Sequence, residues 1–529
     1  MLLTQPASIP KRISSLARSP IFIVGVFVFI TLLLLIQHAL WRDEFNPWLI
    51  VRDSESWIAL WQKVRYEGHP ILWYISLSSL YQLTQNFLSM QLFHWGLGVG
   101  AIVLLWQYSP FRKLEKILIT FGYFPFYEYL IISRNYVLGF FFACLFCVFF
   151  PKRQYYYWPL AIILGLLANS HAYGLLMAVF LALMLVLEFV FDRTQRCAYL
   201  ANHLRRWDLA LSLVTVVSSF ALAIYCISPP ADSRLHGGQE FLFGFDLHRL
   251  FVAIGKISGA YFHLIPNSSR WIDLVVTDLF ILGVLIVINL KLWQMPWVLV
   301  FFNLATLSMT VVMFYLKPLE APRHMGGLFI TLLTSLWLAH YHPDGEAFAD
   351  QNRPFSLPPR TQKFVNRLFR KLFILLLLVH VIAGIAAIIE RELLQPYSAS
   401  RVTANYMIEQ GLKDEFILAS RDAQMAPIAG YLKRQLFYPE RQSYGSFTLF
   451  QDERVSVTQQ ETLRQAITIL EGKNEAVEEQ PAKIILVLNK ELDTSLTTSQ
   501  ETTLSIQFLS QFVRAYTNEQ YYLYQLSLA

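Results

Sequence analysis

Long, uninterrupted runs of apolar residues dominate the first three quarters of the chain. A helix that crosses the roughly 30 Å hydrocarbon core of a bilayer needs about 20 residues, and several runs reach that length. Marking every run predicts about eleven transmembrane helices. They cover residues 20–40, 90–108, 116–132, 136–150, 157–170, 173–191, 208–228, 272–290, 297–316, 326–341 and 372–390. The pattern therefore predicts a polytopic α-helical membrane protein.

Lys and Arg residues lie mostly between the apolar runs, and their distribution predicts the orientation of the chain. If the N-terminus is cytoplasmic, the segments left in the cytoplasm are the basic ones, and the charge bias agrees with the predicted crossings at nearly every loop. These segments include 112–116, 152–153, 193–206 and 353–371. Lys11, Arg12 and Arg18 precede the first run, which indicates an uncleaved signal anchor. The run 71–83 would invert the later loops if it crossed, so we expect an interfacial helix within a long first outer loop, 41–89.

The hydrophobic pattern changes at about residue 391, where the last long apolar run ends. Helical periodicity at 402–412 and 459–470 alternates with strand-like runs at 416–419, 483–489 and 521–528. Residues 1–390 are therefore predicted to form the transmembrane domain. Residues 391–529 are predicted to form a small α/β domain on the outer, periplasmic or extracellular side.

Composition and charge narrow the class of protein further. Of the 529 residues, 55% are hydrophobic and only 15% are charged, whereas soluble domains carry roughly 25% charged residues. The net charge of +6 is modest and the basic residues follow the loops, so we predict membrane lipids and no nucleic acid as partners. Cys144 and Cys147 have a Cys-x-x-Cys spacing, but their phenylalanine-rich apolar run indicates packing rather than redox or metal chemistry.

Charged residues beside membrane-spanning runs are costly, and they mark candidate functional sites. Asp43 and Glu44 follow the first run directly, at the predicted membrane surface. A carboxylate in this place can act as a general base on a hydroxyl group or can bind a divalent metal; the structural alternative is a solvated helix end. Arg134 falls in a tight outer turn between two runs and therefore needs a partner.

The first outer loop resembles that of the GT-C glycosyltransferases, polytopic enzymes that use sugars carried on polyprenyl phosphate. The resemblance rests on Asp43-Glu44, Arg52-Asp53-Ser54, Tyr66-Glu67-Gly68-His69-Pro70 and Leu72-Trp73-Tyr74. The branch containing protein O-mannosyltransferases, aminoarabinose transferases and RgtA-like lipopolysaccharide transferases is the most similar. The outer turns 133–136, 169–174 and 323–326 resemble later elements of the family, so the resemblance covers roughly 20–390.

Two departures from the family pattern limit what the resemblance implies. Asn135 has no acidic neighbour where oligosaccharyltransferases use an additional aspartate for metal, so no cofactor is predicted and a divalent metal is left open. His69-Pro70-Ile71-Leu72 replaces the Lys-Pro-Pro-Leu form that is typical of aminoarabinose transferases, which disfavours aminoarabinose as the sugar.

The resemblance implies that a hexosyl or pentosyl group is transferred, with inversion, from a polyprenyl-phosphate donor on the outer face of the plasma membrane. The acceptor, whether glycan, lipid or protein, is left open. Asp43 is expected to be the general base, and Glu44 to orient the acceptor or tune that base. The expected ligands of the donor phosphate are Arg134, Lys317 and Arg323, and the expected pocket residues are Tyr66, Glu67, His69, Tyr136, His171 and His324.

Two other classes of protein stay open alongside the transferase. A lipid-linked glycan transporter or flippase would carry its charged residues at mid-membrane and show paired broken helices. A polysaccharide polymerase or ligase would lack an acidic pair directly after the first run. The clustering of charge in the outer loops favours the transferase.

Overall fold

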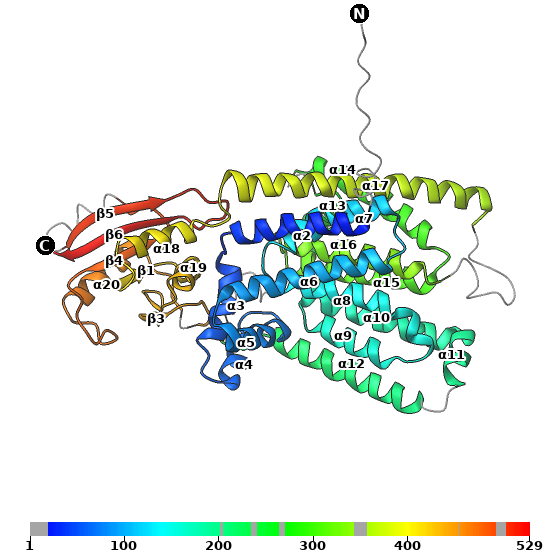
Figure 1. Ribbon diagram of the computed structural model, residues 1–529, viewed down its shortest axis with the longest axis horizontal. Coiled ribbons are helices and arrows are strands. Elements are labelled where there is room, and N and C mark those ends of the chain that lie inside the picture. The colour runs from blue at the N-terminus through cyan, green and yellow to red at the C-terminus, as the bar shows by residue number, and fades with distance from the viewer. Residues whose placement is uncertain are drawn as a thin grey trace, which may run out of the picture.

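The computed structural model describes residues 19–201, 205–233, 241–263, 270–342, 357–452, 454–493 and 504–529. Figure 1 shows a bundle of helices with a sheet-containing domain at one end, and helix α17 runs along the bundle toward that domain. The basic residues predicted for the cytoplasmic N-terminus (Lys11, Arg12 and Arg18) and Arg353 lie outside the described residues.

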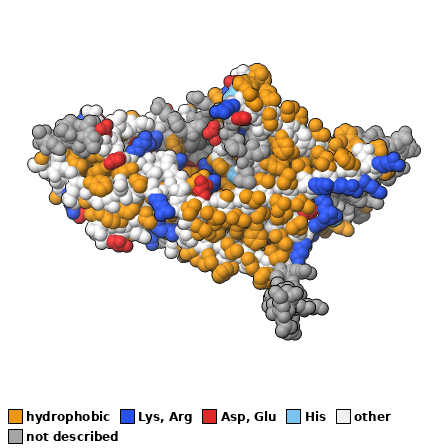
Figure 2. All heavy atoms as spheres, turned by 90° about the horizontal axis from the view of Figure 1, so that it is seen from above, with side chains coloured by type: hydrophobic (Ala, Val, Ile, Leu, Met, Phe, Trp, Pro, Cys, Tyr) orange, Lys and Arg blue, Asp and Glu red, His pale blue; other side chains and the backbone are white. Residues whose placement is uncertain are grey.

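Eight helices in the described part of the chain are long and apolar enough to cross a membrane. They are α2 (Pro20–Gln37), α6 (Phe87–Tyr108), α8 (Tyr136–Phe149, continued by η2, Phe150–Gln154), α10 (Ala172–Phe191), α12 (Arg205–Ile227), α14 (Trp271–Leu292), α15 (Pro296–Met309, continued by η3, Thr310–Leu316) and α17 (Pro359–Ile388, continued by η5, Ile389–Leu394). Figure 2 shows apolar side chains covering most of the surface of the bundle in that view. The prediction of a polytopic helical membrane protein is therefore confirmed.

The other three predicted crossings are helical but shorter or less apolar. Residues 116–132 overlap α7 (Lys113–Thr120) and contain the π-helical turn η1 (Phe124–Glu128). Residues 157–170 contain α9 (Trp158–Ala168), and residues 326–341 overlap α16 (Pro322–Ala339). The count of eleven crossings thus stays a prediction. Helices α11 (Arg193–Leu200) and α13 (Leu247–Tyr261) were not expected from the apolar pattern.

The first outer loop folds into three short helices. They are α3 (Arg42–Arg52), α4 (Trp57–Val64) and α5 (Leu72–Thr84), and α5 has 13 residues, which is too short to span a bilayer. The start of α3 is stabilised by the Glu44 carboxylate, which accepts a hydrogen bond from the Trp41 N–H that would otherwise lack a partner at the helix start. Ser56 caps α4 by accepting from the N–H of Ala59.

The C-terminal part is an α/β domain, as predicted. Its elements are α18 (Ser400–Glu409), β1 (Phe416–Ala419), α19 (Asp422–Leu432), β2 (Leu436–Tyr438), β3 (Ser443–Gly445), α20 (Gln459–Leu470), β4 (Ile484–Leu488), β5 (Leu504–Phe512) and β6 (Tyr521–Leu528). The strand order is β3-β2-β1-β4-β6-β5. Strand β1 is parallel to β2 and β4, and the remaining pairs are antiparallel. Helices α18 and α19 pack into one apolar cluster with the sheet and α20 packs into another.

Candidate functional site

The centre of the candidate site is an ion-pair cluster around Asp43, in the first turn of α3. Asp43 Oδ2 accepts hydrogen bonds from Arg134 Nη1 and lies 3.1 Å from Arg323 Nη2. Arg42 Nε lies 3.6 Å from the other oxygen, Oδ1. The fold thus brings an acid from the first outer loop together with arginines from the turn before α8 and from the start of α16.

The arginines change the acid–base properties of Asp43. Burial would raise the pKa of the Asp43 carboxyl, but the positive charges of Arg134, Arg323 and Arg42 hold that pKa well below its usual range. Asp43 is therefore ionised at every working pH. While the ion pairs persist it is a weak base, because a low pKa means a low affinity for protons.

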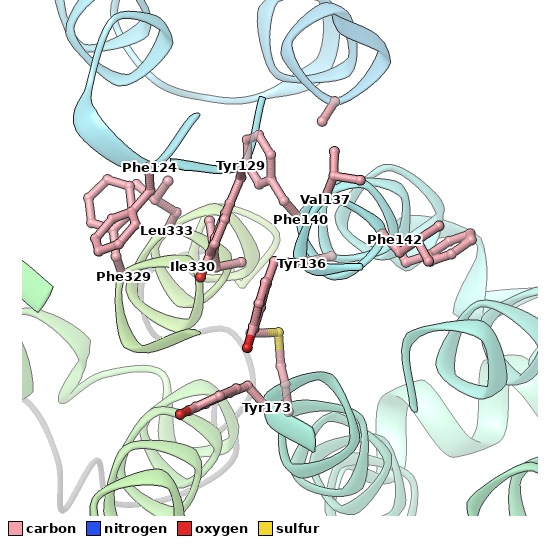
Figure 3. Packing of buried hydrophobic residues seen from close by; sticks show 14 of the residues in the cluster. Phe124, Tyr129, Tyr136, Val137, Phe140, Phe142, Tyr173, Phe329, Ile330 and Leu333 are labelled. Carbon is pink, nitrogen blue, oxygen red and sulfur yellow. The ribbon is translucent and has the colours of Figure 1, made fainter. Parts of the chain in front are cut away.

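Neutral histidines and tyrosines surround Arg134 and Arg323. Arg134 Nη2 lies 3.3 Å from His69 Nε2, and the hydroxyl of Tyr136 lies 3.2 Å from His324 Nδ1. Burial, followed by the charge of Arg134, lowers the pKa of His69 to about 3, so its imidazole is neutral and can accept the arginine N–H. Figure 3 shows Tyr129, Tyr136 and Tyr173 lying between α8, α10 and α16.

His171 reaches the same group of side chains from the N-terminus of α10. Its ring centroid lies 5.1 Å from that of Tyr136. His171 Nδ1 accepts a hydrogen bond of 2.9 Å from the Gly174 N–H, so the proton of the neutral ring is on Nε2. A side chain on Gly139 would collide with that nitrogen, because an added Cβ would lie 2.0 Å from it. The ring orientation therefore places Nε2–H against Gly139 of α8.

Glu67 is a second carboxyl group close to the arginine cluster. Asn46 Nδ2 donates to Glu67 Oε1 at 3.0 Å, and the Tyr74 hydroxyl donates to Oε2 at 3.2 Å. Burial raises the pKa of Glu67 to about 7; the two hydrogen bonds and Arg134 oppose this shift, and Asp43 adds to it. Glu67 is thus a group whose ionisation changes near neutral pH.

Glu44 points away from Asp43, into the protein interior. Its carboxylate is fully buried, contacts His38 Nε2 at 2.9 Å and accepts from the N–H of Ser133 at 2.5 Å. The other nitrogen of His38, Nδ1, lies 2.9 Å from Glu392 Oε1, so the imidazole bridges two buried carboxylates. These contacts connect the start of α3 to the ends of α2 and α17.

Two predicted site residues have described contacts outside the group around Asp43. Lys317 Nζ lies 4.6 Å from the centre of the Phe241 ring. The Tyr66 hydroxyl donates to Asp232 Oδ2 at 2.9 Å. Neither contact joins these residues to the group around Asp43.

Another buried polar group lies nearby and was not predicted from the sequence. The Tyr123 hydroxyl donates to Glu128 Oε2 at 2.6 Å and accepts from Arg391 Nη1 at 3.2 Å. The signal that could have found these residues is a charge at an apolar run, as for Arg134: Glu128 lies within the predicted crossing 116–132, and Arg391 directly follows the crossing 372–390. Trp41 is a further omission; its ring lies beneath the Arg323 guanidinium at 5.4 Å.

The charged side chains around Asp43 do not suit a metal ion. Its carboxylate is paired with guanidinium groups, which repel a divalent cation. No cluster of three or more His, Cys, Asp or Glu side chains that could hold a metal ion occurs among the described residues. The cluster is instead suited to a phosphate group, which binds arginine through charge-assisted hydrogen bonds.

Comparison with known proteins identifies the fold. No protein-family model matches the sequence, and no curated protein matches it. The crystal structure of ArnT from Cupriavidus metallidurans in the apo state aligns with a TM-score of 0.52 at 12% identity, covering 95% of this chain and 97% of that one. ArnT bound to undecaprenyl phosphate aligns with a TM-score of 0.45 at 11% identity, covering 96% and 98%. The arabinofuranosyltransferase AftD from Mycobacteria aligns at 0.37 and 11% identity, covering 98% of this chain and 42% of that one.

The alignment with apo ArnT extends over both the helical bundle and the C-terminal domain, since it covers nearly the whole of each chain. The chain therefore shares the fold of ArnT, in agreement with the fold expected from the resemblance of its first outer loop.

Proposed function

We propose that this protein is a membrane glycosyltransferase that moves a sugar from a polyprenyl-phosphate donor to an acceptor at the outer face of the plasma membrane. The observation that carries the proposal is the Asp43 carboxylate held between Arg134 and Arg323. The fold supports it, because ArnT has the same fold and binds undecaprenyl phosphate. The N-terminus is cytoplasmic in this proposal, and the first outer loop and C-terminal domain face outward.

The two arginines bind the donor phosphate in the proposed mechanism. They lie beside one carboxylate oxygen in the free protein, and a phosphate oxygen can replace that oxygen with similar geometry. When the phosphate takes the arginines, Asp43 loses the charges that hold its pKa down and becomes a better base. Donor binding therefore prepares the base for the acceptor.

A single displacement then completes the transfer. Asp43 takes the proton of the acceptor hydroxyl, and the acceptor oxygen forms a bond to the anomeric carbon of the sugar. The bond from that carbon to the phosphate oxygen breaks on the opposite face, so the anomeric centre is inverted. Polyprenyl phosphate leaves with the bonding electron pair, and Arg134 and Arg323 stabilise its additional negative charge.

The remaining predicted residues take supporting roles in this proposal. Glu44 positions the helix turn that carries Asp43. His69, Tyr136, His171 and His324 line the pocket, where their neutral rings and hydroxyl groups can hydrogen-bond sugar hydroxyls. These side chains offer both hydrogen-bond donors and acceptors, which suits the hydroxyl groups of a carbohydrate. Lys317 and Tyr66 are proposed as peripheral substrate contacts, since their described neighbours lie outside the cluster.

The test is transfer by the purified protein in lipid vesicles, measured as release of polyprenyl phosphate from a panel of polyprenyl-phosphate sugars. Arg323→Gln is expected to lose most of the transfer and of the donor affinity, because it removes one phosphate ligand. Arg52→Gln is the matched control, since Arg52 lies in the same loop and pairs with Asp53 at 2.6 Å. Transfer by Arg323→Gln at the rate of the unmodified protein would contradict the proposal.

A further inference from the structure

The C-terminal domain is packed against α3, the helix that carries Asp43. Tyr431 of α19 lies with its ring centroid 4.9 Å from that of Phe45, and its hydroxyl accepts a hydrogen bond of 3.0 Å from the Leu40 N–H. Gly430 is in close contact with the Phe45 ring, since an added Cβ would lie 2.4 Å from it. Glu519, which precedes β6, accepts from the Arg42 N–H at 2.9 Å. The domain therefore fixes the position of α3 along its first turns.

Asn46 connects this domain directly to Glu67. Its Oδ1 accepts from the Thr448 N–H at 2.9 Å, and its Nδ2 donates to the Thr448 carbonyl at 3.2 Å. The same Nδ2 donates to Glu67 Oε1 at 3.0 Å. The backbone of Thr448 thus fixes the orientation of the amide, and that orientation directs an N–H group toward Glu67.

The surroundings of Glu67 are built for a carboxylate. Both of its oxygens face donors, one from Asn46 and one from the Tyr74 hydroxyl, and hydrogen bonds of this kind favour the ionised form. The charged groups that act on it are Arg134, from the turn before α8, and Asp43, from α3. Arg134 favours ionisation and Asp43 opposes it. Burial also opposes ionisation by raising the pKa of Glu67. The hydrogen bond from Asn46 lowers that pKa and so counteracts burial.

We propose that the C-terminal domain, acting through Asn46, holds Glu67 ionised beside Asp43, and that the ionisation of Glu67 sets the lower pH limit of the transfer. This inference rests on the proposed function. A negative charge on Glu67 raises the proton affinity of Asp43 once the arginines have turned to the donor phosphate. Glu67 is the tuning group, and Asn46 and the C-terminal domain position it.

Asn46→Ala tests the inference by removing the donor to Glu67. The loss of one hydrogen bond to a charged group is expected to move the Glu67 titration upward by about one pH unit, and the lower limb of kcat/KM with it. The titration is measured without turnover from the infrared carboxylic-acid band that Glu67→Gln abolishes. An unchanged midpoint in Asn46→Ala would overturn the inference.

Asn46→Asp is the second variant, in case Asn46→Ala loosens the domain. An aspartate keeps the acceptor for the Thr448 N–H but places a negative charge next to Glu67, so the midpoint is expected to rise further than in Asn46→Ala. Ser446→Ala is the matched control, because Ser446 lies in the same domain and donates its hydrogen bond to a different carboxylate of the loop, that of Asp53. This control is expected to leave the midpoint in place; an equal shift in Ser446→Ala would overturn the role of Asn46.

The two proposals fail in different ways in these experiments. If the infrared midpoint shifts but no polyprenyl-phosphate sugar is turned over, the coupling between domain and carboxyl stands and the glycosyltransferase function fails. If transfer occurs and its pH profile and the infrared midpoint are both unmoved by Asn46→Ala and Asn46→Asp, the function stands and the inference is overturned.

Discussion

The replacement of Asp43 by asparagine is expected to have opposite effects on transfer and on lipid binding. Asp43 accepts from Arg134 and lies 3.1 Å from Arg323, the two arginines proposed to hold the donor phosphate. In the free protein the carboxylate therefore competes with the phosphate for the same guanidinium groups. Asp43→Asn removes the base, and it also removes the competitor.

The expected change in lipid affinity follows from the contacts between Asp43 and the two arginines, which donor binding must break. A hydrogen bond to a charged group contributes about 1.5–3 kcal/mol net, and Asp43 makes two such contacts through one oxygen. The Asp43 side chain is 24% exposed, so water compensates for part of the loss, and we take the net cost as roughly 1.5 kcal/mol. Removing this cost is expected to tighten binding of polyprenyl phosphate about tenfold. Loss of a general base is expected to slow transfer about 100- to 10,000-fold.

Equilibrium binding of undecaprenyl phosphate to the protein in nanodiscs measures the first effect, and release of polyprenyl phosphate measures the second. The low pKa of Asp43 means that it is ionised throughout the neutral range, so the affinity difference is expected to be the same at pH 6 and pH 8. Asp53→Asn is the control, since Asp53 pairs with Arg52 and not with the phosphate site. Weaker binding by Asp43→Asn than by the unmodified protein would refute the exchange of carboxylate for phosphate.

Three further predictions concern stability. Glu188→Gln leaves the buried Arg153 guanidinium, now 2.8 Å from Glu188, without its charge partner, and is expected to destabilise the fold by about 3–5 kcal/mol without changing lipid binding, as followed by thermal unfolding. Gly430→Ala forces a methyl group into the Phe45 ring, so it is expected to lower the free energy of unfolding by about 1–3 kcal/mol and to increase proteolysis of the C-terminal domain. Gly25→Ala is the control and is expected to do neither, because the space around Gly25 is open. Burial raises the pKa of Glu519 to about 8, so the native state holds that proton more tightly than the unfolded state and stability is expected to fall as pH rises from about 4.5 to about 8. Glu519→Gln is expected to remove this decline, and an unchanged pH dependence of its melting temperature would contradict the assignment.

The C-terminal domain shows which elements local sequence determines. Helix α20 and strands β1 and β6 begin and end where their patterns predict, because helical spacing and short apolar runs specify these elements locally. Helix α19 was missed because Pro427 lies inside it and its small residues give a weak pattern. Strand β5 was missed although Leu504–Phe508 alternates apolar and polar residues, because the irregularity between Phe508 and Ser510 interrupts that alternation.

The individual residues of the candidate site could be predicted from their positions along the chain, but their contacts with one another in space could not. Charged residues next to apolar runs identified Asp43, Arg134 and Arg323, yet nothing in the local pattern says that these three meet. The difference between Asp43 and Glu44 depended on a helix that the apolar pattern does not predict. Successive residues of a helix point about 100° apart, so within α3 these two acids face opposite surroundings. In a flexible loop they could have acted as a pair.

The position of Asp43 depends on contacts made by its neighbours rather than by its own side chain. Glu44 is held by His38, which is held in turn by Glu392 at the end of α17, just before the chain enters the C-terminal domain. The opposite side of α3 is held by that domain through Asn46. A carboxylate on a free loop would move with the arginines when phosphate arrived, and it would gain no basicity from the exchange. Because α3 is anchored on both sides, the proposed mechanism keeps Asp43 in place when Arg134 and Arg323 turn to the donor phosphate. A charge arrangement that is fixed in this way is what a preorganised electrostatic environment contributes to catalysis.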